Sequence, residues 1–263
     1  MNDAQRILQA AHARNRADDL LYATYRLSAS EPLDAFVLAP AWTPEMLFAD
    51  APVSVCTRLV HPTESSYLVE YAGLRLGWIQ CGVGTASLVD AALLAAESPT
   101  KRWIFAGSAG SLRPDIGLGE FATPSESLAY EGGSIYLSGS LQPKTFGRAV
   151  RPSNPEFVRA AIEAAAAMGV ALTPRRTFCT ESILCEYAMI DQILATGAEI
   201  IEMETAAFYE CARMAERDAV ALLNISDSSL SGVGLLGRTE EEKALHSRAR
   251  QRIPALIEAV CRL

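Results

Sequence analysis

The stretch AEIIEMETAAFYECARMAERD, residues 198–218, changes its apolar pattern near Met203 and Glu204. Its first part is short and rich in isoleucine, as is typical of a buried strand, and the part from Thr205 onward has the pattern of a helix. A strand that leads directly into a helix is the unit from which α/β proteins are built. The junction also carries two carboxylates, Glu202 and Glu204, whose burial is costly unless something binds them.

Short apolar runs alternate with helical patterns along the rest of the chain. Strands are expected at 34–40, 74–82, 101–107, 119–130, 174–180, 198–203 and 219–227. Helices are expected at 85–98, 155–170, 187–197 and 205–218, with a terminal helical region that is kinked or split near Pro254. This alternation predicts a three-layer α/β/α sandwich around a central mixed, twisted sheet. We expect one such domain over residues 35–263, preceded by an N-terminal helical extension over 1–34.

The composition argues for a soluble, cytoplasmic protein. Hydrophobic residues make up 50% of the 263 residues and charged residues 21%, so a sizeable core is expected and disorder is not. The net charge of −8 and the absence of a Lys/Arg cluster disfavour a nucleic-acid partner. The sequence shows neither a membrane-spanning apolar run nor the apolar core of a signal peptide, so no membrane contact is expected. Six cysteines without a CxxC pair, with three histidines, make structural zinc improbable, and no metal or cofactor is expected.

Polar or glycine-rich stretches follow most of the predicted strands. They are APAWTPE, GVG, GSAG, TESIL, EMET and SDSS. Ligands of open α/β sheets bind outside the carboxyl ends of the strands. The joint placement of these stretches therefore predicts one pocket, although each pattern is weak by itself.

Three of these stretches resemble, in the same order, signature regions of the nucleoside phosphorylase/nucleosidase superfamily. They are GSAGSLRPDIGLGEF (107–121), IEMETAA (201–207) and ISDSS (225–229), and the segment 81–95 is similar to the superfamily's second glycine turn and helix. The superfamily includes purine nucleoside phosphorylases, uridine phosphorylases and methylthioadenosine/S-adenosylhomocysteine nucleosidases. The resemblance spans roughly residues 35–250. It implies cleavage of the N-glycosidic bond of a small nucleoside and assembly as a homo-oligomer, whether dimer, trimer or hexamer.

The resemblance implies that the EMET stretch binds the sugar. Glu204 would anchor two ribose hydroxyls as an ionised acceptor, kept charged by its place near a helix N-terminus. Met203 would offer a polarizable apolar surface to the sugar. Glu202 is a weaker candidate for substrate binding, and either glutamate could instead cap the helix.

Asp227, by the same resemblance, would donate a proton to N7 of a departing purine. Burial disfavours the anion, so a carboxyl in a closed pocket can hold its proton near neutral pH. Ser226 and Ser228 could orient it. The alternative is an ordinary helix cap after a strand. This aspartate is not typical of uridine phosphorylases, so its presence favours a purine.

Two further stretches are candidates for the substrate pocket. Ser108, Ala109 and Gly110 form a tight turn that could approach the ligand closely or simply join two segments. Ile183, in a stretch similar to the one that lines the base, would be the apolar wall for the ring. Plain core packing is the alternative for Ile183.

The sequence departs from the phosphorylase pattern at two arginine positions. Aligning Pro40 with the superfamily's first-loop proline places Glu45 where an arginine would bind phosphate, and Phe105 stands at the second arginine position. Two unit charges about 4 Å apart interact by roughly 4 kcal/mol at an effective dielectric near 20, so Glu45 would repel phosphate. Methylthioadenosine-type nucleosidases carry a glutamate in this loop that deprotonates water. Glu45 is therefore interpreted as a general base, or as an exposed glutamate that starts a helix.

Remaining cations are harder to assign. Arg58 could orient the water or a 5′ group at the sugar edge, and Arg113 and Arg238 are equally possible. His61 could enter a neighbouring subunit's site, or be a surface loop residue.

The leading hypothesis is therefore a purine nucleosidase that uses Asp227, Glu204 and Glu45. A phosphorylase with relocated phosphate ligands is the second, and a catalytically quiet nucleoside-binding relative is the third.

Overall fold

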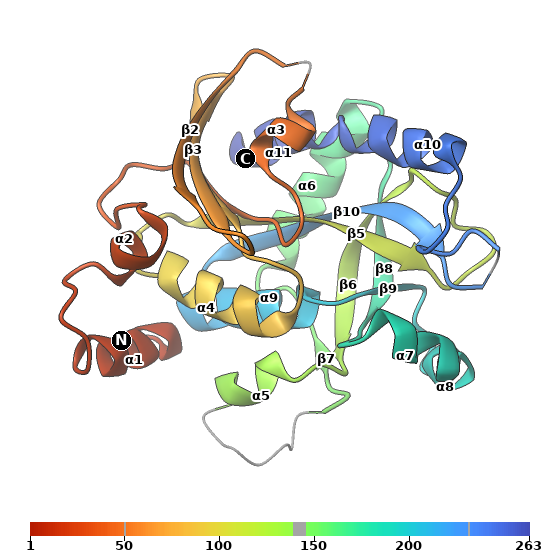
Figure 1. Ribbon diagram of the computed structural model, residues 1–263, viewed down its shortest axis with the longest axis horizontal. Helices are drawn as coiled ribbons and strands as arrows, with labels where there is room; N and C mark the ends of the chain where they lie inside the picture. The colour runs from red at the N-terminus through yellow and green to blue at the C-terminus, as the bar shows by residue number, and fades with distance from the viewer. Residues whose placement is uncertain (50, 139–145, 231) are drawn as a thin grey trace.

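The computed structural model describes residues 1–49, 51–138, 146–230 and 232–263 (Figure 1). The strands are β1 (Ala35–Leu38), β2 (Val53–Val60), β3 (Ser65–Tyr71), β4 (Leu74–Gln80), β5 (Arg102–Ser111), β6 (Phe121–Ala129), β7 (Ala149–Val150), β8 (Leu172–Cys179), β9 (Ile200–Glu202) and β10 (Asp218–Ser228). The helices are α1 (Asp3–His12), α2 (Leu20–Tyr25), α3 (Pro44–Leu47), α4 (Thr85–Ala95), α5 (Gly133–Leu137), α6 (Pro155–Ala167), α7 (Ile183–Ala188), α8 (Ile190–Ala195), α9 (Thr205–Ala215), α10 (Glu240–Arg250) and α11 (Ile253–Cys261). None of the described helices is long and apolar enough to span a membrane.

All the described strands belong to one mixed sheet. The long strands β5 and β10 run parallel at its centre, and β1, β4, β3 and β2 extend it on one side. On the other side β10 pairs with β6, β6 with β8, β8 with β9, and β9 returns to β5. The mixed α/β fold is confirmed. These pairings also join β5, β10, β6, β8 and β9 into a closed ring, which brings several strand ends to one place.

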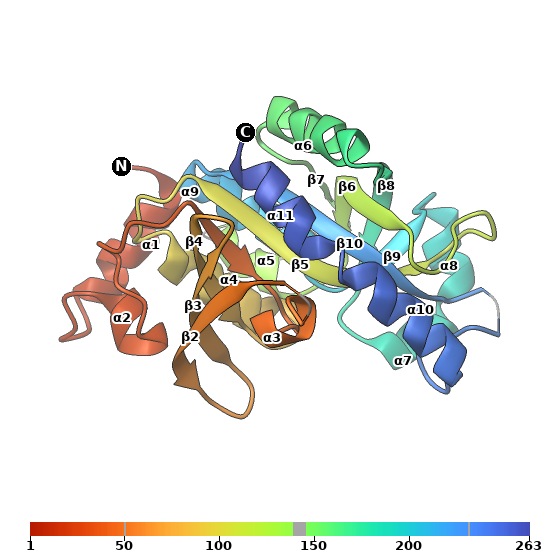
Figure 2. The same cartoon turned by 90° about the horizontal axis from the view of Figure 1, so that it is seen from above.

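The central strands are buried on both faces. Phe36 and Leu38 of β1 belong to one apolar core, and the intervening Val37 belongs to the other. Successive side chains of a strand point to opposite faces, so strands covered on both sides are apolar throughout. Figures 1 and 2 show α4 and α9 on one face of the sheet and α6 and α11 on the other.

The N-terminal helices α1 and α2 pack on the same core as α4 and α9. Ala4, Leu8 and Leu21 are buried in that core. The backbone N–H of Leu21 donates to a carboxylate oxygen of Glu97 at 2.7 Å, and His12 lies 2.6 Å from the other oxygen. The extension is thus helical, as predicted, and it packs against the core. Its status as a separate unit stays a prediction.

Three local expectations need correction. Ser108, Ala109 and Gly110 do not form the expected tight turn, because β5 continues as a strand to Ser111. The single helix predicted over 187–197 is two helices, α7 and α8, which meet at Met189, and α7 begins as early as Ile183. The hairpin of β2 and β3 was not expected, because β2 is an edge strand with many exposed side chains and has no strong apolar signal. The break near Pro254 is confirmed, since α10 ends at Arg250 and Pro254 lies in the first turn of α11.

Candidate active site

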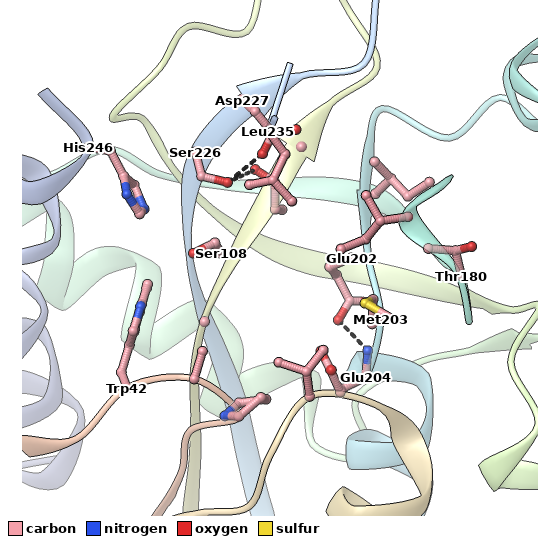
Figure 3. A pocket seen from close by; sticks show the side chains of 18 of the residues that line it. Trp42, Ser108, Thr180, Glu202, Met203, Glu204, Ser226, Asp227, Leu235 and His246 are labelled. Carbon is pink, nitrogen blue, oxygen red and sulfur yellow. Dashed lines mark hydrogen bonds between the residues drawn. The ribbon is translucent and has the colours of Figure 1, made fainter. Parts of the chain in front are cut away.

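The carboxyl ends of β1, β5, β9 and β10 open into a cavity of about 330 Å³ (Figure 3). The lining includes the residues of the GSAG, EMET and SDSS stretches that were expected to bind substrate or act in catalysis. It also includes Ile183. Together these are Ser108, Ala109, Gly110, Ile183, Glu202, Met203, Glu204 and Asp227. The strand exits converge as the sequence predicted. The parallel strands β1, β5 and β10 end at one edge of the sheet, and β9 reaches the same place by pairing antiparallel with β5 at Gly110.

The two glutamates at the β9–α9 junction have different surroundings. One oxygen of Glu202 accepts hydrogen bonds from the backbone N–H groups of Glu204 and Thr205, at 2.7 and 2.8 Å. The other oxygen accepts from the Thr205 hydroxyl at 2.8 Å and the Cys179 thiol at 2.6 Å. Burial raises the pKa of Glu202, and these hydrogen bonds oppose the shift. Glu202 therefore caps the start of α9, and its carboxylate is fully occupied.

Glu204 has a carboxylate with capacity to spare. It is 5% exposed, and its carboxylate accepts a hydrogen bond from the backbone N–H of Gly84 at 2.6 Å. Gly84 has a φ of 108°, which a side chain would strain, so the glycine permits this approach. Burial raises the pKa of Glu204, and the nearby Glu202 raises it further. Burial thus opposes the ionised form that the helix N-terminus was expected to favour, and the anionic state of Glu204 stays a prediction.

Asp227 is placed by an irregularity in the sheet. The register of β10 against β5 shifts between Ile225 and Asp227, so that Asp227 lies opposite Gly110. Such bulges redirect side chains. A Cβ atom on Gly110 would lie 3.0 Å from an Asp227 carboxylate oxygen, so only glycine leaves room for the acid.

The Asp227 carboxyl is buried and held by one neighbour. It is 5% exposed and accepts a hydrogen bond from the Ser226 hydroxyl at 2.5 Å, whereas Ser228 makes no such contact. Burial raises its pKa, although the Ser226 hydrogen bond and the charge of Arg238 act in the opposite direction. The group is thereby suited to carry a proton into a reaction.

A second carboxyl lines the same part of the cavity and was not anticipated from the sequence. Glu186 of α7 is 4% exposed and accepts a hydrogen bond from the Ser229 hydroxyl at 3.0 Å. Burial raises its pKa to about 7, with a further contribution from Asp227. Nothing in its local sequence marks it, since it lies inside a short helix whose orientation depends on the ring of strands.

The opposite side of the cavity is built by α10 and the segment before it. Arg238, His246 and Arg250 line it, together with Trp42 from the loop after β1. The rings of Trp42 and His246 have centroids 6.3 Å apart. In Figure 3 Ser108 projects between this pair and the Glu202–Glu204 junction. Of Trp42, Arg238, His246 and Arg250, only Arg238 was a candidate from the sequence, because the local pattern of α10 does not show what its faces cover.

Two predicted site residues lie outside the cavity. Glu45 is exposed in the first turn of α3, because Pro44 and Leu47 are the residues of that turn that pack inward. Arg58 lies on the edge strand β2, where its guanidinium is 3.3 Å from a Glu31 carboxylate. The structure therefore does not bring either residue to the other candidates.

The remaining residues considered from the sequence lie at the surface or in the cavity wall. His61 is exposed just after β2, within 3.2 Å of the Thr63 hydroxyl, and Arg113 pairs with Asp115 at the surface. A contribution of His61 to another subunit stays a prediction. Phe105 lines the cavity as an apolar side chain, 1% exposed and packed on Phe208.

The family model of the phosphorylase superfamily matches residues 48–262 of the chain. The chain belongs to this superfamily. No curated protein sequence matches it significantly.

Two solved structures show the same fold at low identity. Purine nucleoside phosphorylase from Toxoplasma gondii, in complex with immucillin-H, has a TM-score of 0.68 and 17% identity, covering 90% of this chain and 93% of its own. The 5′-methylthioadenosine/S-adenosyl homocysteine nucleosidase of Campylobacter jejuni has a TM-score of 0.68 and 15% identity, covering 88% and 99%. Both neighbours are enzymes that act on an N-glycosidic bond, one a phosphorylase and one a nucleosidase. This superfamily member is accordingly an enzyme of the same broad class.

Proposed function

We propose that the protein cleaves the N-glycosidic bond of a purine nucleoside, with Asp227 as the acid and Glu204 as the ribose anchor. The observation that carries the proposal is the pairing of these two buried carboxyls on one cavity. Asp227 comes from β10 and Glu204 from the β9–α9 junction, and Met203 lines the wall beside Glu204. Burial raises the pKa of both carboxyls, and each has few competing protein partners.

The chemistry follows from these positions. As the C1′–N9 bond breaks, its electron pair moves to the purine, and Asp227 donates a proton to the base. The sugar becomes electron-poor at C1′, as in other glycoside cleavage. Ribose hydroxyls that donate to Glu204 would favour its anion, which lowers its pKa again upon binding. Substrate binding would thereby fix both the position and the charge of Glu204.

The nucleophile is the finer part of the proposal. Water is what the sequence favours, but the exposed position of Glu45 outside the cavity gives no support to it as the base. Phosphate is the second candidate. Arg238 and Arg250 favour it, because neither forms an ion pair with a carboxylate among the described residues.

A panel of purine and pyrimidine nucleosides, incubated with and without phosphate, tests the proposal. We expect release of free purine, with free ribose or ribose 1-phosphate as the sugar product. Binding without release of base from any purine nucleoside would indicate the catalytically quiet relative instead. Release of uracil in preference to a purine would contradict the role given to Asp227.

A further inference from the structure

Arg238, His246 and Arg250, here termed the α10 cluster, form a cationic side of the cavity in a chain of net charge −8. The three side chains come from α10 and the segment just before it, and they influence one another. The charges of both arginines act on the His246 ring, and that of Arg238 also reaches Asp227. The cluster thus begins beside the acid and extends away from it.

The arginines of this cluster lack acidic partners. Two partly buried arginines elsewhere pair with carboxylates, Arg148 with Glu210 at 3.2 Å and Arg175 with Glu199 at 3.0 Å. Among the described residues Arg238 makes one hydrogen bond, to the Ser226 carbonyl at 3.0 Å, and Arg250 makes none. The Nε atom of each is buried without a partner.

His246 is the second, independent observation. It is 7% exposed, and its Nε2 atom is buried without a hydrogen-bond partner. Figure 3 shows the ring directed into the cavity, toward Trp42 and Ser108. Burial and the two arginines lower its pKa to about 4, which favours the neutral ring. Buried polar groups without partners are uncommon and indicate an unfilled role.

We infer that the α10 cluster binds a phosphate dianion. Two guanidinium groups offer paired N–H donors that match phosphate oxygens, and the imidazole supplies a further polar contact. The family positions that would bind phosphate are Phe105 and the loop that carries Glu45, so this anchor comes from a different element. Trp42 closes the site from the side of β1.

Two sources of phosphate fit this chemistry, and both rest on the proposed function. Inorganic phosphate would attack C1′ through one oxygen while the C1′–N9 pair leaves with the base, giving ribose 1-phosphate and purine. A phosphate ester of a nucleoside monophosphate would instead be a recognition handle. Water would then supply the oxygen at C1′, giving ribose phosphate and purine.

Binding can be tested without any turnover. The chain has only three histidines, so the imidazole signals in a ¹H–¹⁵N NMR spectrum are few. Inorganic phosphate, and separately a nucleoside monophosphate, should shift the His246 signals in a saturable way, with His12 and His61 as internal references. A nearby anion favours the charged ring, so the apparent pKa of His246 should rise on binding.

Variants at Arg250 give the kinetic arm. Arg250→Gln should raise the KM for phosphate, or for the nucleoside monophosphate, about tenfold or more. Either ligand would lose its charge-assisted hydrogen bonds to the guanidinium. Arg250→Lys should recover part of this effect because it keeps the charge without the fork. Arg248→Gln, an exposed position on the same helix, is the matched control and should change KM less than twofold.

The arms separate the two sources and the two proposals. Phosphate-dependent turnover with ribose 1-phosphate as product identifies inorganic phosphate, and a preference for the monophosphate in phosphate-free buffer identifies the ester. If neither probe shifts His246, and Arg250→Gln behaves like Arg248→Gln, the anion site is overturned. Loss of all glycosidic cleavage with intact phosphate binding would instead overturn the proposed function alone.

Discussion

The two sides of the cavity differ in how their charged groups are held. On the strand side, Glu202 and Asp227 lie at the ends of β9 and β10, and Glu204 follows β9. Backbone N–H groups or a neighbouring hydroxyl hold each one. On the helix side, the Nε atom of Arg250 and the Nε2 atom of His246 are buried without a hydrogen-bond partner among the described residues. The strand side is therefore prearranged for one geometry, whereas a ligand would complete the helix side.

The largest expected effect is on the strand side, at the proposed acid. Asp227→Asn keeps the shape but removes the transferable proton, so turnover on purine nucleosides should fall about 10²–10⁴-fold. The measurement is the rate of purine release under saturating substrate. Asp191→Asn, at an exposed position on α8, is the control for a lost carboxylate. A fall of less than threefold with intact folding would make Asp227 an ordinary structural residue.

The second prediction separates the two glutamates of the β9–α9 junction. Glu204→Gln removes the charged acceptor for the ribose hydroxyls, and hydrogen bonds to charged groups contribute about 1.5–3 kcal/mol. We expect kcat/KM to fall about 10²-fold with little loss of stability. Glu202→Gln should instead lower the free energy of unfolding, because Glu202 caps α9. Steady-state kinetics and urea unfolding of both variants test the division, and reversed outcomes would contradict it.

A third prediction concerns the space that the acid needs. Gly110→Ala would place a Cβ atom 3.0 Å from an Asp227 oxygen and 3.2 Å from the Ile201 side chain. Displacement of the acid should reduce kcat about tenfold, since small misplacements of reacting groups are costly. Gly232→Ala, where a Cβ meets nothing within 4 Å, is the matched control. Equal activity of the two variants would show that Asp227 tolerates the shift.

A fourth prediction uses pH and Glu186. Its pKa is about 7 in the folded chain and about 4.3 in an unfolded one, so the folded state binds more protons between these values. The stabilisation from its protonated form is complete below about pH 4.3 and is lost as the pH rises through about 7. Urea unfolding at several pH values should show a smaller decline for Glu186→Gln than for the wild type. The exposed Glu163→Gln variant should follow the wild type, and an unchanged slope in Glu186→Gln would contradict the assignment.

The smallest effect is expected at Glu45. Because this side chain is exposed and outside the cavity, Glu45→Gln should keep purine release within about threefold of the wild type, far from the 10²–10⁴-fold range of general base catalysis. The assay should be run in phosphate-free buffer, where a water base would matter most. A drop of about 10²-fold there would restore Glu45 as the base and weaken the distinction between the two sides.

Much of the fold and of the strand side was predictable from the sequence. The apolar runs of β1, β5 and β10 and the patterns of α6 and α9 are local signals, because burial on two faces or one sets the period of the sequence. Candidate site residues that directly follow strands were found for the same reason: a strand end fixes the place of the next few residues.

The sequence alone was enough to predict that carboxylates lie at the strand ends of an α/β protein and that a glycine turn follows β4, since these features depend on a few neighbouring residues. Only long-range packing determined which glutamate caps α9, that Asp227 lies opposite Gly110, and that Glu45 is exposed outside the cavity. It also brought Glu186, His246 and Arg250 to the site from helices. The physical reason is that pairing between distant strands and packing of helices on them place these side chains, and neither leaves a periodic trace in the local sequence.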